Sequence, residues 1–256
     1  MSDRSSASDR PAVAGTGQLR ADAARIAELA VSGPLDAAVP DCPGWALRDL
    51  VVHLGTIHRW AAECVGTAAE PTTRWQDLHR EIADDVLASW FAEGADALAD
   101  ALDERAPDAP TWTPFPIEAP TVSVWTRRQT HETSLHRRDA EAALGVIGPI
   151  GAALAADGVD EYFGVIVPRL VQRDGLRLPP AGSAHLHCTD TEGEWTLEVV
   201  DGEYVLDREH RKGDAAVRGT AEQLLLRVWG RDVPGDALEV LGDADVAAAW
   251  LGLGGN

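Results

Sequence analysis

Lysine is almost absent from this sequence of 256 residues: Lys212 is the only one, and the other basic side chains among the 22 are arginines. Acidic residues number 42, so the formal net charge at neutral pH is −20. A chain so acidic lacks the basic stripe that nucleic acids require, and anionic membrane surfaces repel it. We therefore expect neither a nucleic acid nor a membrane among its partners.

Long apolar runs and paired cysteines are missing as well. No apolar stretch reaches about 18 residues, the length that marks a membrane-spanning helix. The opening MSDRSSASDRPAVAGTG has no apolar signal-peptide region, so residues 1–16 are expected to be a disordered lead-in to a cytoplasmic protein. The three cysteines, at positions 42, 64 and 188, form no CxxC pair, which favours reduced thiols over disulfides or a cysteine zinc site.

Helical periodicity dominates the first part of the chain. Apolar residues recur every three or four positions in segments 18–32, 46–66 and 75–103. A fourth helix is expected over about 121–144, ending at Gly145. These helices predict a four-helix bundle over residues 17–150, followed by one more helix over 153–173.

The pattern changes after residue 150. Segments 183–190, 193–202 and 202–209 alternate polar and apolar residues between turns, which is typical of antiparallel strands in a meander. Residues 214–231 predict a short strand and then an apolar helix, and 242–253 predict a last short helix. We expect residues 151–256 to form a smaller α+β domain with an antiparallel sheet, so the fold class is α+β.

The expected fourth helix contains HETSLHRRDAEAALG and has no clean apolar stripe. At about 100° per residue, Arg128, Glu132, His136 and Asp139 share one face to within about 40°, and the opposite face is polar too. A helix that is polar all round is either solvated or has a reason to bury charge. We interpret the Glu132 face as the buried one, because a bound cation would compensate the carboxylate. Asp139 would then either accept a hydrogen bond from a ligand histidine or form part of a solvated face.

Glu132 and His136 are four residues apart, so their side chains share one helix face, as a carboxylate and an imidazole do in bundle metal sites. His53 lies within about 60° of the centre of the second helix's apolar stripe and is the candidate third ligand, whereas His58 points more nearly away. His131 is expected outside the site. Three protein ligands would leave one position open, as in catalytic zinc sites. The alternatives are a solvated Glu–His pair and a core histidine at position 53.

Two further histidines, Cys42 and the tryptophans are also candidates for ligands or pocket walls. His185 and His187 alternate on one strand face, but no third ligand is evident, so an ordinary sheet surface is the favoured interpretation. Cys42 is expected to be structural. The nine tryptophans are expected in the core, with Trp45 and Trp125 as additional candidates for a pocket wall.

Four segments resemble the mycothiol-dependent maleylpyruvate isomerase family: VPDCPGWALRDLVVHLGTIHRWA, HETSLHRRDAEAALG, SAHLHCTDTEGEWTLEVVDG and AVRGTAEQLLLRVWGR. The resemblance covers nearly the whole chain beyond its start. It implies a DinB-like four-helix bundle followed by a sterol-carrier-like α+β domain. It also implies mycothiol as thiol cosubstrate and a divalent metal, usually zinc, held by the matching residues His53, Glu132 and His136.

The resemblance further implies an enzyme that uses a metal-activated thiolate for cis–trans isomerisation, or for thiol transfer to a small electrophilic substrate. Arg231 is the best match to the family's substrate-site arginine, with Arg218 as a rival. Arg128 is a second candidate cation, unless it merely pairs with Glu132 or Asp139. Zinc, nickel and manganese remain open as the metal. We expect a monomer. The alternative function is a non-catalytic binding module for an apolar ligand or a protein partner, with a structural metal or none.

Overall fold

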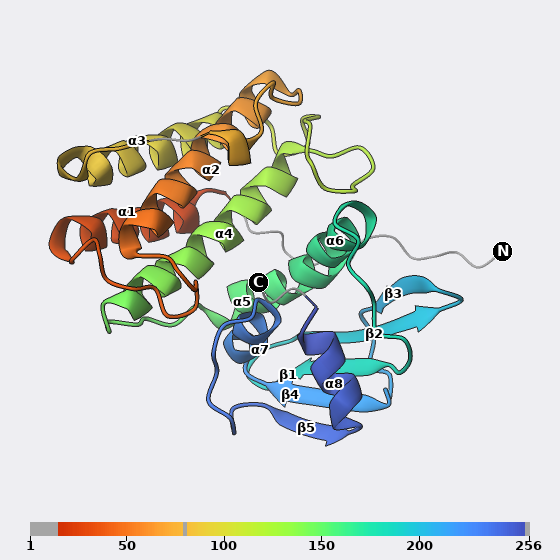
Figure 1. The fold of residues 1–256 in the computed structure, drawn as a ribbon. Coiled ribbons are helices and arrows are strands. Elements are labelled where there is room, and N and C mark those ends of the chain that lie inside the picture. The colour runs from red at the N-terminus through yellow and green to blue at the C-terminus, as the bar shows by residue number, and fades with distance from the viewer. Residues whose placement is uncertain (1–14, 79–80, 254–256) are drawn as a thin grey trace.

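The computed structural model describes residues 15–78 and 81–253 (Figure 1). The lead-in expected over 1–16 therefore lies mostly outside the described residues. Its last residue, Thr16, is buried, and its hydroxyl donates a hydrogen bond to Asp103 at 2.8 Å. None of the helices in the described part of the chain is both long enough and apolar enough to cross a membrane.

Four helices pack together in the first half of the molecule. Both α1 and α2 lie against α3 and α4, which closes the bundle. Two apolar clusters fill its interior, one around Leu50 and Phe91 and the other around Leu98 and Trp125. The helices are α1 (Gly17–Ser32), α2 (Leu47–Thr67), α3 (Asp84–Asp103) and α4 (Val122–Ala143).

The third helix is shorter than the sequence pattern predicted. Residues 75–103 were expected to be helical throughout, but a single 3₁₀ turn, η1 (Trp75–Asp77), comes first and α3 begins only at Asp84. Asp84 and Asp85 occupy the first turn of α3, where their negative charges interact favourably with the positive end of the helix dipole and stabilise the start of the helix. The other three bundle helices begin and end within one residue of their predicted bounds.

The second half begins with a helical rod that changes its winding midway. The predicted helix over 153–173 is present, but five residues in its middle form a π-helical turn, a feature often found at functional sites. Two further short helices cover the sheet. The helical elements are α5 (Ala152–Glu161), η2 (Tyr162–Ile166), α6 (Val167–Arg173), α7 (Ala221–Val228) and α8 (Ala244–Leu251).

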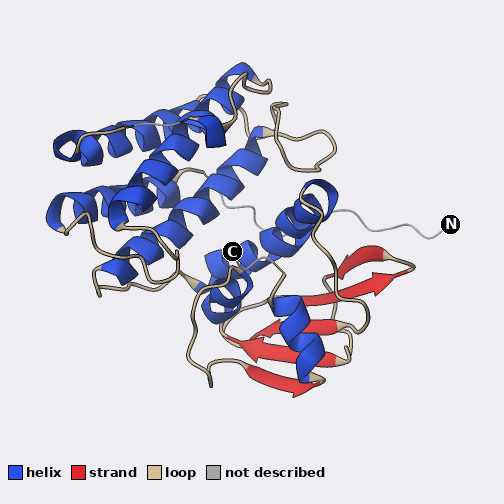
Figure 2. Ribbon diagram, in the orientation of Figure 1, coloured by secondary structure: helices blue, strands red, loops and turns tan. Residues whose placement is uncertain are grey.

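A five-stranded sheet completes this half, in the order β3-β2-β1-β4-β5 (Figure 2). The predicted meander β1-β2-β3 is antiparallel, and so is the pair β4–β5. However, β4 runs parallel to β1, so the sheet is mixed, and β5 was not predicted. The alternation of polar and apolar residues indicates on which face of the sheet a side chain lies, but it does not indicate the direction of the neighbouring strand. The strands are β1 (Ala184–Cys188), β2 (Glu194–Val200), β3 (Glu203–Asp207), β4 (Ala215–Gly219) and β5 (Glu239–Gly242).

The α4 helix lies between the two halves (Figure 1). Leu186, Trp195 and Val217 of the sheet belong to one apolar core with residues of α5, α7 and α8, and Leu135 of α4 joins it. Trp125, also on α4, belongs instead to a bundle cluster. The predicted α+β class is confirmed, and the position of α4 decides where the polar residues of that helix are placed.

Candidate metal centre and cavity

Most polar side chains of α4 are buried and the others are half-buried, although the helix is polar on all sides. The bundle and the second half cover opposite faces of α4. The Glu132 face was expected to be the buried one, but the structure covers the opposite polar face as well. The buried groups are compensated by partners from other elements as well as by one another. These partnerships are Arg127 with Asp157 and Asp160, His131 with Asp157, Ser134 with Asp22, and Arg137 with Asp22 and Glu141.

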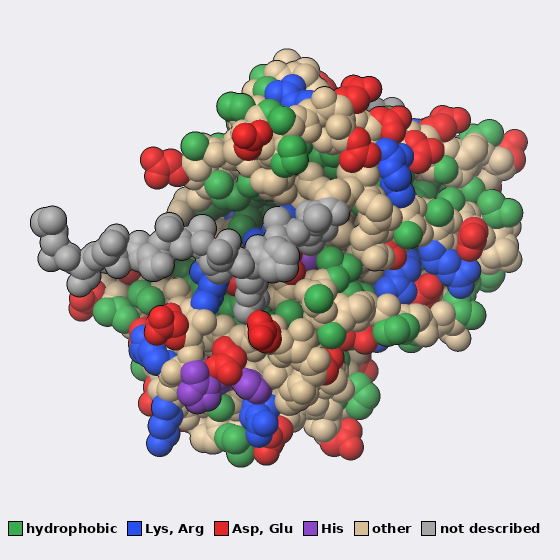
Figure 3. All heavy atoms as spheres, turned by 180° about the vertical axis from the view of Figure 1, so that it is seen from behind, with side chains coloured by type: hydrophobic (Ala, Val, Ile, Leu, Met, Phe, Trp, Pro, Cys, Tyr) green, Lys and Arg blue, Asp and Glu red, His purple; other side chains and the backbone are tan. Residues whose placement is uncertain are grey.

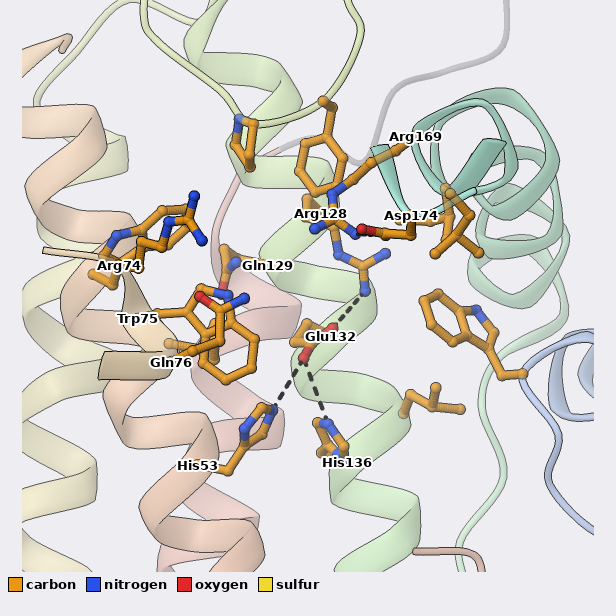
Figure 4. A pocket seen from close by; sticks show the side chains of 18 of the residues that line it. His53, Arg74, Trp75, Gln76, Arg128, Gln129, Glu132, His136, Arg169 and Asp174 are labelled. Carbon is orange, nitrogen blue, oxygen red and sulfur yellow. Dashed lines mark hydrogen bonds and ion pairs between the residues drawn. The ribbon is translucent and has the colours of Figure 1, made fainter. Parts of the chain in front are cut away.

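The structure brings His53, Glu132 and His136 together from α2 and α4 (Figure 4). The Glu132 Oε1 atom lies 3.7 Å from His53 Nε2 and 3.5 Å from His136 Nε2. Both distances are too long for a good hydrogen bond. Zinc–ligand bonds of about 2.0–2.1 Å in a tetrahedron separate the ligand atoms by roughly 3.4 Å. The spacing of these three donors therefore fits a small divalent cation placed among them.

Two neighbours fix the orientation of this donor set. Arg128 Nη2 donates to Glu132 Oε2 at 2.8 Å, which leaves Oε1 facing the two imidazoles, and Arg128 Nη1 donates to Glu161 at 2.5 Å. Asp139 Oδ2 lies 2.9 Å from His136 Nδ1. A carboxylate can only accept here, so His136 Nδ1 carries a proton and Nε2 is the ring nitrogen that faces Glu132. Such carboxylate–histidine pairs are typical behind metal-binding histidines.

The electrostatics of this group favour positive charge between the imidazoles. Burial alone would raise the pKa of Glu132, but the adjacent His136 and His53 rings and the Arg128 charge hold it well below its ordinary value. Burial would lower the pKa of His136, yet the adjacent Asp139 and Glu132 carboxylates outweigh burial and raise that pKa to about 9. The surroundings of His136 Nε2 thus stabilise a cation, whether a proton or a metal ion.

The CPGW turn before α2 places an aromatic wall beside both imidazoles. Gly44 has a φ of +84°, a left-handed conformation that favours glycine. The chain then returns, so that Val39 N donates to the Trp45 carbonyl at 2.9 Å. The Trp45 ring centroid lies 4.8 Å from that of His53 and 6.3 Å from that of His136. This short motif therefore positions Trp45 against the candidate metal centre, as the sequence suggested for a pocket wall.

The WGR segment after α7 brings a guanidinium behind the candidate ligands. Gly230 has a φ of +71°, and Arg231 N donates to Leu226 O at 2.8 Å, which closes the helix in a Schellman turn. Arg231 then donates to both oxygens of Asp139, at 2.7 and 3.3 Å, and to the Trp229 carbonyl at 2.8 Å. The sequence proposed Arg231 for the substrate, but its donors are largely occupied by Asp139.

Arg218 and Cys42 are also located by the structure. Arg218 is exposed on β4, bonds to Glu239 at 3.1 Å and does not line the cavity described below, so the geometry favours Arg231 over this rival. Cys42 Sγ donates to Asp139 at 3.7 Å, and burial with nearby acidic charge raises the pKa of its thiol to about 12. Cys42 is therefore a protonated neighbour of the centre, and none of the three cysteines is in a disulfide.

Two histidines near the centre take no part in it. His58 was predicted to point more nearly away from the interior, and this was wrong: it is fully buried, with Nε2 2.9 Å from Thr133 Oγ1. Burial lowers the pKa of His58 to about 3, so it stays neutral. His131 lies outside the centre as predicted, with Nε2 2.7 Å from Asp157 Oδ2.

A cavity of about 1070 Å³ opens beside the candidate centre, between the bundle and α6. Six of the nine tryptophans line it, many more than the two that the sequence suggested. The residues of η2 and α6 that line the cavity recur at helical spacing. The first of them belong to the π-helical turn η2. Its aromatic lining consists of Trp45, Trp60, Trp75, Trp112, Phe115, Trp125, Tyr162 and Trp229.

The cavity also contains polar groups that sequence reasoning missed. Trp60 Nε1, Gln129 Oε1 and Tyr162 OH are buried in its wall, and none of them has a hydrogen-bond partner among residues 15–78 and 81–253. Arg74 and Arg173 are exposed residues of its wall, and neither forms an ion pair with another described residue. Figure 4 shows Arg74 on the α2 side of the cavity. Nothing in the local sequence distinguishes these residues, because their roles depend on the cavity that distant segments enclose.

These features define a class: a two-part protein whose four-helix bundle carries a His–Glu–His cluster at a cavity closed by an α+β half. The family model for the mycothiol maleylpyruvate isomerase N-terminal domain matches residues 16–141, and the MDMPI C-terminal domain model matches residues 153–249. The chain therefore belongs to the mycothiol-dependent maleylpyruvate isomerase family, as its motifs indicated.

Solved structures agree with this membership at the level of the fold. The mycothiol-dependent maleylpyruvate isomerase superposes with a TM-score of 0.57 at 12% identity, and a histidine-to-alanine mutant of it with 0.59 at 11%. In both comparisons 87% of this chain and 90% of the other chain are covered. No curated protein sequence matches the chain significantly. At this identity the structural likeness establishes the fold, and the reaction has to be argued from the site.

Proposed function

We propose that this protein is a metal- and mycothiol-dependent enzyme of the maleylpyruvate isomerase type. The observation that carries the proposal is the meeting of His53, Glu132 and His136 at the wall of a cavity of about 1070 Å³. Three such ligands suit zinc and would leave one coordination position free. A divalent cation held there would lower the pKa of a thiol that binds to it, and so would supply a thiolate at neutral pH.

The surrounding residues have separate tasks in this proposal. Arg128 holds Glu132 Oε2 and keeps Oε1 turned to the imidazoles. Asp139 fixes the tautomer of His136 and stabilises positive charge on its ring. The aromatic walls, with Trp45 nearest, keep water from the reacting atoms. Low local polarity strengthens the attraction between the thiolate and cationic groups of the site.

For maleylpyruvate, the thiolate sulfur adds to one carbon of the cis double bond. The remaining carbon–carbon single bond rotates, and expulsion of the same thiolate restores the double bond in the trans form. The thiol is regenerated and no oxidant or reductant is needed. If the electrophile carries a leaving group instead, the same thiolate displaces it, which makes the protein an S-transferase. Isomerisation is the proposal favoured by family membership.

Mycothiol is the thiol proposed, and the polar groups of the cavity support a polyhydroxylated ligand. Trp60 Nε1 offers a donor, Gln129 Oε1 an acceptor and Tyr162 OH both, and all three atoms lack partners in the described part of the chain. Buried polar groups rarely remain without hydrogen bonds. Sugar and inositol hydroxyls reaching these atoms would satisfy them while the sulfur lies at the metal.

The test is calorimetry of mycothiol with zinc-loaded and metal-free protein. We expect binding only to the zinc-loaded form, with release of a proton that is revealed by comparing buffers of different ionisation enthalpy. Equal affinity for both forms would show that the sulfur does not meet the metal, and the mechanism would have to be abandoned. Zinc-loaded protein that binds no thiol would instead support a non-catalytic binding module.

Exposed arginines of the cavity wall should bind the carboxylates of an anionic substrate. Arg128 and Arg231 are engaged by Glu132 and Asp139, so Arg173 is a better candidate for this task. Arg173→Gln is expected to raise KM for maleylpyruvate about tenfold and to leave kcat within about twofold, because it removes binding common to ground and transition states. Steady-state kinetics at saturating mycothiol measure both constants.

Arg177→Gln is the matched control, since Arg177 is exposed four residues further along and does not line the cavity. It should behave as the wild type. If the two variants have the same KM, the cavity arginine does not contact the substrate.

A further inference from the structure

A second group of candidate ligands lies on the sheet, away from the bundle. His185 and His187 alternate along β1 with Leu186, which belongs to the apolar core, so both imidazoles project from the opposite face. The β1–β2 register pairs His187 with Glu194 and His185 with Thr196. Directly opposed residues of an antiparallel pair have neighbouring side chains. The register therefore supplies the third ligand that the sequence pattern of β1 lacked.

A fourth residue comes from the connection between β3 and β4. His210 Nδ1 lies 2.7 Å from Glu194 Oε2, and the adjacent Arg211 donates to Glu198 at 2.9 Å. Glu194 and Glu198 lie on the same face of β2, so this connection crosses that face. Figure 3 shows histidine side chains gathered beside acidic ones on the lower part of the molecule.

One imidazole of this group is buried with an unsatisfied nitrogen. His185 is only 5% exposed, and its Nε2 forms no hydrogen bond with any residue that the structure describes. That atom lies 3.6 Å from Glu194 Oε2, beyond hydrogen-bond distance, while His187 Nδ1 is 2.9 Å from Glu194 Oε1. A single carboxylate thus stands among three imidazoles. Buried polar atoms rarely remain without a partner, and a cation would engage all of these donors together.

We propose that His185, His187, Glu194 and His210 bind a second divalent cation of the zinc type. Donor atoms of the first three all lie within 4.8 Å of one another. Imidazole nitrogens with one carboxylate suit zinc, copper or nickel, whereas calcium and magnesium prefer oxygen donors. His210 lies against Glu194 beside this group, and as a fourth protein ligand it would close the coordination shell, which is the pattern of a structural site. The bound ion ties the connection over residues 208–214 to β1 and β2.

Cleavage after Lys212 measures whether a bound ion holds the connection over residues 208–214 against the sheet. Lys212 is the only lysine of the chain, it is exposed, and it lies two residues after His210. A lysine-specific endoproteinase therefore cuts the folded protein at one bond, between Lys212 and Gly213. If cleavage requires the connection to open, zinc at about ten times its dissociation constant should slow the cut about tenfold.

The experiment uses the full chain with the Glu132→Gln substitution as background. This substitution prevents zinc bound at the bundle site from contributing to the measured effects. In this background we expect zinc to slow the cut, and equilibrium dialysis to find one zinc per chain. Adding Glu194→Gln should remove both effects. Glu198→Gln is the matched control, because it removes a carboxylate from the same strand and face that also holds the connection. It should keep the zinc and the protection by zinc.

His187→Asn is a second ligand variant at a partly exposed position, and it should also lose both effects. Circular dichroism of every variant without zinc establishes that the fold is retained. The proposal is overturned if zinc fails to slow the cut in the Glu132→Gln background. It is also overturned if zinc slows the cut as much in the variant with Glu194→Gln as in the variant with Glu198→Gln. Neither result would bear on the bundle site, which the mycothiol calorimetry tests separately.

Discussion

The Glu132→Gln variant should lose the zinc of the bundle and, with it, all mycothiol-dependent isomerase activity. Glutamine keeps the size of the side chain but removes the negative charge between His53 and His136. Removing a partner of a ligand typically costs about 10–100-fold in metal affinity. Removing a ligand charge itself should cost more than that. The fold should survive, because Arg128 retains its bond to Glu161.

Metal analysis of protein purified without a histidine tag checks this result, together with an activity assay at saturating mycothiol. The zinc content should fall by one per chain relative to the wild type, since the site proposed on the sheet is untouched. Glu70→Gln is the matched control: Glu70 is an exposed carboxylate of the same cavity that lies outside the ligand cluster. A Glu132→Gln protein with undiminished zinc and activity would refute the proposed centre.

The pairing of Glu132 with His136 could be predicted because it depends on helical spacing alone. Glu132 and His136 share a face at any point of a regular helix, and the apolar stripe of α2 indicated that His53 turns inward. The same reasoning failed for His58, which also turns inward. A stripe centred on one residue describes a helix with one buried side, whereas α2 packs against both α3 and α4.

Groups that meet only through the tertiary fold were beyond the sequence. Glu194 joins His187 through a strand register, and Arg231 reaches Asp139 across 92 positions of the chain. The sequence pattern of α4 did show that its charges needed an explanation. It did not show that the second half of the molecule would cover the other face and supply Asp157 and Asp160 to Arg127. Periodicity describes one element at a time, and a site between elements requires their packing.

Replacement of Asp139 by asparagine should destabilise the protein by about 3–5 kcal/mol, the usual cost of breaking a buried ion pair from one side. Asp139 is fully buried and accepts hydrogen bonds from both His136 and Arg231. An amide has one oxygen for these two donors, and its own NH₂ group would face the other. Chemical denaturation with a chelator present measures this loss without a contribution from bound zinc.

The same substitution should weaken zinc binding by about 10–100-fold, because His136 loses the carboxylate that fixes its tautomer and raises its basicity. Adding Arg231→Met to Asp139→Asn separates the two effects. The double variant no longer buries an unpaired guanidinium, so it should recover much of the stability that Asp139→Asn loses. Its zinc affinity should stay as low as that of the single variant, since nothing restores the charge behind His136. Zinc competition against a chromophoric chelator measures this affinity, and wild-type affinity in Asp139→Asn would mean that Asp139 serves only Arg231 and has no part in the metal centre.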